Sequence, residues 1–146
     1  MSALTEYLEN KLINHVFRNV AYTTPGTSVY VGLIGYYESG GANGLEQGLK
    51  PYNGSNKELS GGSYARVQHT AWRSPYTVGT SGVIDNNTAV TFPTATGNWG
   101  MVSGVIIADA STQGNVLMHG ALTTPRDVKS GDVFKFNAND LDITFS

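Results

Sequence analysis

The sequence predicts a mainly β protein, an antiparallel β-sandwich or jelly-roll-like barrel with one N-terminal α-helix. Two observations predict this fold class. After residue 82, apolar and polar residues alternate in short runs separated by Gly, Asn, Asp and Pro, a pattern typical of half-buried strands joined by turns. The helical pattern is confined to the opposite end of the chain, at residues 2–18, so helix and strands are segregated and do not alternate as in a nucleotide-binding α/β fold.

The helix is predicted to run from Ser2 to Arg18. Ser2 is of the residue type that caps helix N-termini, and Glu6 near the start and Arg18 near the end carry the charges that the helix dipole favours. Apolar residues recur every four positions, so the row they form drifts around a cylinder of 3.6 residues per turn. Either the whole apolar surface of the helix packs into the protein's own core, or part of it meets a neighbouring subunit, and both interpretations remain open. The row and the apolar residues beside it are Leu4, Leu8, Leu12 and Val16, with Tyr7, Ile13 and Phe17.

About seven strands are predicted in the rest of the chain. The first is rich in β-branched and aromatic residues and nearly continuously apolar, which indicates a central position in its sheet. The fourth and fifth are predicted to form a hairpin through the turn residues 109–115. A long Gly-, Asn- and Ser-rich segment, residues 38–62, is interpreted as a loop that is either functional or without fixed structure. The predicted strands are residues 28–36, 63–70, 88–92, 102–108, 116–122, 132–136 and 141–145.

Length and composition indicate one domain, residues 1–146, with the helix at 2–18 and the β-sandwich at 28–146. Charged residues make up only 14% of the chain and the net charge is −2, with nine scattered Lys and Arg residues, so nucleic acid is not expected as a partner. The chain has no Cys, which excludes disulfides, thiolate metal sites and Cys nucleophiles. No export signal and no membrane-spanning segment are expected, and folding calls for no cofactor.

The search for catalytic chemistry yields no candidate catalytic, cofactor-binding or metal-binding residue. Nucleophile-elbow, phosphate-loop, dinucleotide, zinc-protease and EF-hand motifs are all missing from the sequence. The three histidines, His15, His69 and His119, are far apart and are interpreted as surface or interface residues. The aspartates of the C-terminal half are interpreted as turn formers or solvent-facing strand residues: Asp109, Asp127, Asp132, Asp140 and Asp142.

The aromatic residues point first to core packing, then to protein interfaces and last to carbohydrate binding. Trp99, flanked by glycines just before a strand, is predicted to fill a corner of the fold. Trp72 lies in the aromatic loop that follows the predicted strand 63–70, and it is predicted to be the more exposed of the two. The hypothesis of subunit contact rests on apolar and aromatic side chains of the helix, the long loop and the aromatic loop. The candidate interface residues are Leu4, Leu8, Leu12, Tyr52, Trp72 and Tyr76.

Several blocks, in a conserved order along nearly the whole chain, resemble a family of small tailed-bacteriophage virion proteins usually labelled tail fibre proteins. Each block is weak alone, and their ordered combination makes the resemblance specific. The blocks are residues 2–18, Val29-Tyr30-Val31-Gly32-Leu33, residues 58–66, residues 91–100, and Gly120-Ala121-Leu122-Thr123-Thr124-Pro125 with Gly131-Asp132. The resemblance implies a structural, non-enzymatic component of the virion, assembled in the cytoplasm of the host bacterium.

A single globular pattern without repeats or heptads suits a compact module better than a long fibre. The leading hypothesis is therefore a capsid-decorating cement protein or a tail-associated module, acting through contacts with itself, as a homotrimer, and with major capsid or tail proteins. The alternative is a carbohydrate-binding module that attaches to a glycan of the host surface. A hydrolase built on a β-sandwich ranks third, and a pocket with paired carboxylates or a Ser–His contact would favour it.

Overall fold

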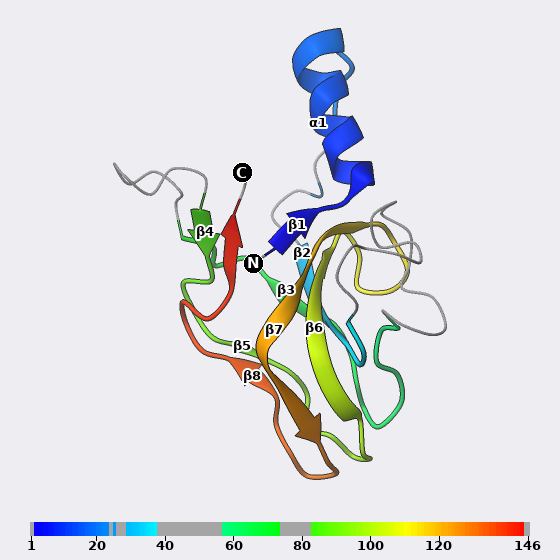
Figure 1. The fold of residues 1–146 in the computed structure, drawn as a ribbon, viewed down its shortest axis with the longest axis vertical. Coiled ribbons are helices and arrows are strands. Elements are labelled where there is room, and N and C mark those ends of the chain that lie inside the picture. The colour runs from blue at the N-terminus through cyan, green and yellow to red at the C-terminus, as the bar shows by residue number, and fades with distance from the viewer. Residues whose placement is uncertain (1, 24, 26–28, 38–56, 74–82, 145–146) are drawn as a thin grey trace.

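The computed structural model describes residues 2–23, 25, 29–37, 57–73 and 83–144, and it confirms a mainly antiparallel β fold with one N-terminal helix (Figure 1). The described residues contain nine strands where about seven were predicted. Their order along the chain is β1 Ser2–Leu4, α1 Glu6–Arg18, β2 Val29–Ile34, β3 Val67–His69, β4 Val83–Asp85, β5 Val90–Thr91, β6 Gly100–Ala108, β7 Val116–Val128, β8 Lys135–Phe136 and β9 Asp142–Thr144.

The start of the helix corrects the sequence prediction. Ser2 does not cap α1, because residues 2–4 form strand β1 and pair antiparallel with β7. Thr5 is the N-cap: its hydroxyl oxygen accepts a hydrogen bond from the Leu8 N–H at 3.4 Å. The same hydroxyl lies 2.7 Å from the carbonyl oxygen of Val116 in β7, and the Thr5 N–H donates to the carbonyl of Leu117 at 3.0 Å. The helix therefore begins where a buried threonine is bonded to the sheet.

A five-stranded sheet in the order β1-β7-β6-β2-β3 forms the larger layer. The predicted hairpin is confirmed, since β6 and β7 pair antiparallel around residues 109–115, and β2 lies between β6 and β3 as its apolar sequence indicated. The Asp109 carboxylate accepts hydrogen bonds from the backbone N–H of Asn115 at 2.7 Å and from its side-chain amide at 2.8 Å, which closes the connection. Asp109 is thus a turn former, as predicted.

Strand β7 is longer than predicted because it continues past a large bulge. Gly104 of β6 pairs with Ala121, but Val102 pairs with Arg126, so residues 122–125 of β7 face only Ser103. The bulge contains Pro125, which cannot donate a ladder hydrogen bond and is tolerated at such irregularities. It bends β7 strongly in its middle (Figure 1).

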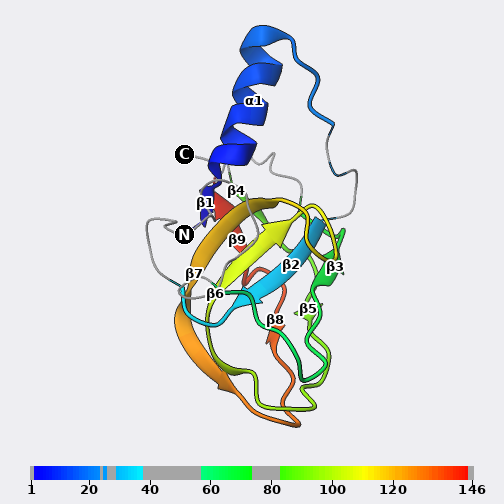
Figure 2. The same cartoon turned by 90° about the vertical axis from the view of Figure 1, so that its right-hand side faces the viewer.

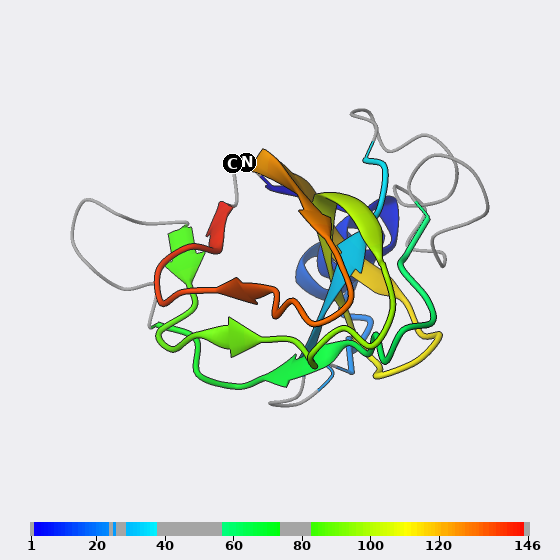
Figure 3. The ribbon, with the colours of Figure 1, turned by 90° about the horizontal axis from the view of Figure 1, so that it is seen from below.

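A smaller layer made of two short pairs, β4–β9 and β5–β8, faces this sheet (Figure 3). Strand β4 was not predicted, and the last two strands do not pair with each other but with β5 and β4. The layers join beyond β3, where the Arg73 N–H donates to the Asp85 carbonyl at 2.9 Å and the Asn87 N–H to the Ala71 carbonyl at 2.8 Å. Within the described residues, no backbone hydrogen bond joins β7 to β8 or β9, so the sandwich is closed along one side only.

The main core lies between the two layers. It contains a cluster of aromatic rings in which Phe92, Phe134 and Phe136 contact one another edge to face at centroid distances of 5.2–6.3 Å. Trp99 is buried, and its indole N–H donates to the Gly62 carbonyl at 2.8 Å, which confirms the predicted corner position. A second cluster, which includes Leu8, Ile107 and Ile143, packs the base of the helix against the sheet.

A buried ion pair fastens the segment after the long predicted loop to the sheet. Arg66 and Glu58 form a bidentate pair, with Nε–Oε1 at 2.7 Å and a terminal nitrogen to Oε2 at 2.8 Å, and their side chains are only 3% and 19% exposed. The other terminal nitrogen of Arg66 donates to the carbonyls of Ala110 and Gln113 at 2.8 and 2.9 Å. One arginine therefore holds the β6–β7 connection and the segment around Glu58 together.

Tyr64 extends this network to β2. Its hydroxyl donates to Glu58 Oε1 at 2.9 Å and accepts from the Leu33 N–H at 2.8 Å. Burial, followed by the nearby charge of Glu58, raises the pKa of Tyr64 far above its ordinary value. Burial alone would lower the pKa of Arg66, but the hydrogen bonds and charge of Glu58 outweigh it and raise that pKa. Gly32 makes room for the network, because a Cβ there would lie 3.0 Å from Glu58 Oε1 and 3.1 Å from the Tyr64 hydroxyl.

The segment 38–62 is described only in part. Residues 38–56 lie outside the described residues, whereas residues 57–62 run along the end of β2, with Glu58 opposite Ile34 and the Leu59 N–H donating to the Leu33 carbonyl at 3.0 Å. The C-terminal part of the predicted loop is therefore an ordered edge of the sheet.

Candidate functional site

The six candidate interface residues fall into three groups. Leu8 is buried between α1 and the sheet, and Leu4 and Leu12 are half-buried against the same cluster. Trp72 was predicted to be exposed, but it is half-buried: its indole N–H donates to the His69 carbonyl at 3.3 Å and its ring contacts the His69 ring edge to face at 4.8 Å. Tyr52 and Tyr76 lie outside the described residues. Four of the six thus contribute packing within this chain.

The surface that the helix leaves uncovered is its distal half. Helix α1 touches the sheet only near its base and projects away from the strands (Figures 1 and 2). Four large apolar side chains on this half are exposed: Ile13 by 54%, Val16 by 67%, Phe17 by 80% and Val20, just beyond the helix, by 51%. We call them the helix stripe. The spacing i, i+3 and i+4 places Ile13, Val16 and Phe17 on one face of the helix, and Val20 follows the left-handed residue Asn19 beyond its end.

The sequence identified Ile13, Val16 and Phe17 as apolar surface of the helix, but it could not show that they are exposed while Leu8 is buried. Both sets follow the same periodicity, and only the position of the sheet shows which one is covered. Val20 was missed because it follows Asn19, a left-handed C-cap residue, with φ of 52°, whose backbone turns away from the helix. The Val20 N–H donates to the Asn14 carbonyl at 3.1 Å, which keeps this residue against the last turn.

The histidines occupy separate parts of the fold. His15 is exposed on α1, whereas His69 and His119 are buried, which corrects the expectation that all three lie at a surface or interface. His119 Nδ1 is hydrogen-bonded to the Tyr37 hydroxyl at 2.9 Å, and His69 Nε2 lies 3.1 Å from the Ala71 carbonyl. In the described part of the chain, no cluster of three or more His, Cys, Asp or Glu residues is arranged to hold a metal ion.

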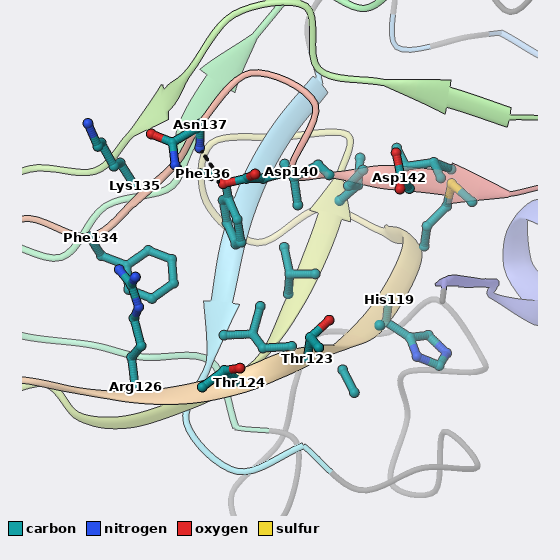
Figure 4. A pocket seen from close by; sticks show the side chains of 18 residues that line it. His119, Thr123, Thr124, Arg126, Phe134, Lys135, Phe136, Asn137, Asp140 and Asp142 are labelled. Carbon is teal, nitrogen blue, oxygen red and sulfur yellow. Dashed lines mark hydrogen bonds between the residues drawn. The ribbon is translucent and has the colours of Figure 1, made fainter.

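A groove of about 430 Å³ opens along the unclosed side of the sandwich, between β7 and the segment that carries β8 and β9 (Figure 4). Its floor is apolar, with Val105, Leu122 and Ile143 among the lining side chains. Its rim is polar: Thr123, Thr124 and Arg126 lie on β7, and Lys135, Asn137, Asp140 and Asp142 lie on the opposite wall. An apolar floor with hydrogen-bonding groups along the rim is typical of a binding site.

The acidic residues of the groove correspond to the roles predicted for them. Asp140 Oδ2 accepts hydrogen bonds from the backbone N–H of Asn137 at 2.8 Å and from its side-chain amide at 3.1 Å, so it forms the turn between β8 and β9. Asp142 is exposed on β9. His119 also lines the groove, but its imidazole is directed away from both carboxylates (Figure 4). The polar groups of the rim are thus placed for hydrogen bonding to a bound molecule.

Comparison with known protein families gives a match that spans almost the entire chain. The profile of the family described as Podophage GP4 fiber I protein gp80 matches residues 3–144. The chain belongs to this family. Membership in this fibre family confirms the resemblance to phage tail fibre proteins and places the chain among virion structural proteins.

A search of the curated proteins found no match. Within the described ranges, no helix of the protein is long and apolar enough to cross a bilayer. Helix α1 has 13 residues, whereas a membrane-spanning helix needs about 20.

Proposed function

We propose that this chain is a non-enzymatic structural module of the phage virion, which assembles with other copies of itself and with neighbouring virion proteins through the helix stripe. The family supports the virion role. The observation that carries the finer proposal is the exposure of Ile13, Val16, Phe17 and Val20 on, and just beyond the end of, a helix that projects from the body of the protein.

The size of the helix stripe supports a contact surface. The exposed area of its four side chains is on the order of 400 Å², comparable with the largest apolar patch of a typical monomer, which is often functional. Burial of this area stabilises a complex because apolar surface leaves water. A standard interface buries about 800 Å² on each partner, so the stripe supplies roughly half of that requirement. Three copies with their helices side by side around an axis would let each stripe contact two neighbours, which favours a trimer over a dimer.

The orientation of the helix also supports an assembly role, because it leaves apolar side chains uncovered. Leu8 faces the protein's own core. At 3.6 residues per turn, Phe17 lies about 180° and Ile13 about 140° around the cylinder from Leu8, whereas Val16 lies only about 80° away but two turns further along the helix. The N-terminal end of α1 is therefore bonded to β7 through Thr5, and its C-terminal half exposes apolar side chains that a partner could cover.

The test is the molar mass of the purified protein by light scattering coupled to size-exclusion chromatography. We expect a multimer, and we expect Phe17→Ser to shift it toward the monomer by at least about tenfold in dissociation constant, since a buried Phe contributes about 1.5–3 kcal/mol. The matched control is Lys11→Ser, which introduces the same side chain at an exposed position away from the stripe. A monomeric wild type, or equal effects of the two variants, would contradict the proposal.

The place of the module on the particle is a separate part of the proposal. We propose a tail-associated or capsid-decorating position in which contacts with tail or major capsid proteins supply the remaining buried area. A cryo-electron microscopy map of the intact particle tests this directly. Density for the β body next to tail or capsid subunits, with α1 between them, is the expected result, and particles that lack the protein would exclude a virion role.

A further inference from the structure

The groove lies where a strand is missing from the sandwich. Strand β7 pairs with β6 along one edge, and on its other edge β1 covers only Met118 to Gly120. In the described part of the chain, that second edge has no backbone partner from Ala121 to Arg126, and neither does the facing edge at Lys135–Phe136 and at Asp142 and Ile143. We call the opening between these two edges the open seam. Unpaired strand edges are templates for an additional strand.

Strand β1 shows how a segment fits this edge. It runs antiparallel to β7, with Leu4 opposite Met118 and Ser2 opposite Gly120, and it packs beside β9. It occupies one end of the gap between the layers, and the groove continues in line with it. A second strand that continues β1 in the same direction would face Ala121 to Thr124 and stop at Pro125, which has no N–H to pair.

The side chains of the open seam suit an extended peptide. Successive side chains of a strand point to opposite faces, so alternate residues of such a segment would point to the apolar floor, which includes Val105, Leu122 and Leu141. The remaining side chains would face solvent and the rim. A cavity of about 150 Å³ lined by aliphatic side chains holds a benzene molecule, so a volume of about 430 Å³ has room for two or three aliphatic side chains.

The charged residues along the rim indicate which end of a bound segment would be acidic. Arg126 and Lys135 lie toward the end of the groove that is distant from β1, and Asp142 lies on β9, the strand beside β1. In the described residues, neither cation forms an ion pair with a carboxylate. A segment antiparallel to β7 has its N-terminal end near Arg126, so an acidic residue at that end would find two cations.

We propose that the open seam binds an extended segment of another polypeptide, acidic at its N-terminal end and apolar at alternate positions, which adds to β7 in line with β1. This inference goes beyond the proposed function, because it uses a surface separate from the helix stripe. Strand addition of this kind obtains affinity from backbone hydrogen bonds and specificity from the pockets for alternate side chains. The bulge at residues 122–125 also shapes the site, since it places Thr123 and Thr124 on the wall of the groove.

The experiment adds a strand of known sequence to the N-terminus of the protein itself. The segment Asp-Thr-Val-Thr-Val is inserted ahead of Met1, where the direction of β1 leads into the open seam and the last Val would face Leu122. We expect hydrogen exchange of the amides from Ala121 to Thr124 to slow by about tenfold or more, and the melting temperature to rise. The matched control is Asp-Pro-Thr-Pro-Thr, which has the same length but lacks two donors and the apolar side chains.

A second measurement uses the unmodified protein and the free peptide acetyl-Asp-Thr-Val-Thr-Val-amide. Saturable chemical-shift changes confined to residues 119–126 and 134–143 would support the proposal. Unchanged exchange with the insertion, or equal protection by the proline control, would overturn it. Exchange protection in the unmodified protein that increases with its own concentration would show that the occupant is a second copy, and would overturn the assignment to a different polypeptide.

Discussion

Removal of Glu58 is expected to destabilise the protein more than its position along the edge of β2 suggests. The perturbation is Glu58→Ala. It removes both acceptors of the bidentate pair with Arg66 and the acceptor of the Tyr64 hydroxyl, at distances of 2.7, 2.8 and 2.9 Å. The guanidinium stays in place, because its other terminal nitrogen is bonded to the Ala110 and Gln113 carbonyls. The result is a buried charge that has lost the carboxylate bonded to it.

The magnitude follows from burial. The Arg66 side chain is only 3% exposed, so water cannot replace the lost carboxylate without opening the segment. Removal of one partner from a buried ion pair costs about 3–5 kcal/mol. The exposed pair Lys129–Asp127 provides the contrast, with a separation of 3.8 Å and side chains exposed by 69% and 50%, and such a pair contributes at most about 1 kcal/mol. Asp127→Ala is therefore the matched control.

The assay is urea unfolding of wild type, Glu58→Ala, Arg66→Met, the double variant and Asp127→Ala. We expect the double variant to lose less stability than the sum of the single variants, by about 1–3 kcal/mol, because it leaves no unpaired charge. A loss of under about 1 kcal/mol for Glu58→Ala would refute the reasoning, and so would additive single variants.

Three further predictions follow from buried groups. Above about pH 10 an unfolded tyrosine ionises, while Tyr64, whose pKa is raised in the folded protein, keeps its proton. The free energy of unfolding should therefore fall by up to about 1.4 kcal/mol per pH unit as the pH rises above this value. Urea unfolding across alkaline pH should show this fall in the wild type, and the Tyr64 contribution to it should be missing in Tyr64→Phe. Gly104→Ala should destabilise by about 1–3 kcal/mol in thermal unfolding, because the added Cβ would lie 2.6 Å from the Tyr37 Cβ, whereas Gly97→Ala, with its nearest neighbouring atom at 3.6 Å, should be nearly neutral. Thr5→Val should lower the free energy of unfolding by about 2 kcal/mol in calorimetry, because it removes the helix cap and the hydrogen bond to β7. Thr5→Ser keeps the hydroxyl and should retain most of that stability. Equal losses in the two variants would contradict the role of the hydroxyl.

The elements that the sequence predicted correctly are those with a local period. The helix over 6–18 and the hairpin of β6 and β7 repeat their apolar positions over several turns or alternations, and turn residues separate the two strands. Trp99 was placed correctly as well, because glycines on both sides indicate a tight corner that a large ring can fill. The fold class and the fibre family followed from these patterns and from the ordered blocks along the chain.

The errors occurred where a residue's partner is distant in sequence. Thr5 caps α1 and bonds to the Val116 carbonyl, 111 positions away, so a local pattern favoured Ser2 as the cap. Strand β4 has three residues, too few for a period to appear. His69 pairs with Val29 of β2, His119 is hydrogen-bonded to the Tyr37 hydroxyl 82 positions away, and Trp72 packs against both core clusters, so the burial of these residues depends on neighbours that are distant in sequence.

The sequence by itself determined the type of each long element, because the period of its apolar residues is a local property. Only the tertiary structure decided which apolar residues are covered and which edges stay open. Leu8 and Val16 belong to the same row of apolar residues spaced four positions apart, yet Leu8 is buried against the sheet and Val16 is exposed. The open seam depends in the same way on the bulge in β7 and on the short β1, both of which arise from pairing between distant strands. Contacts of this kind are a property of the assembled layers, so no window of neighbouring residues contains them.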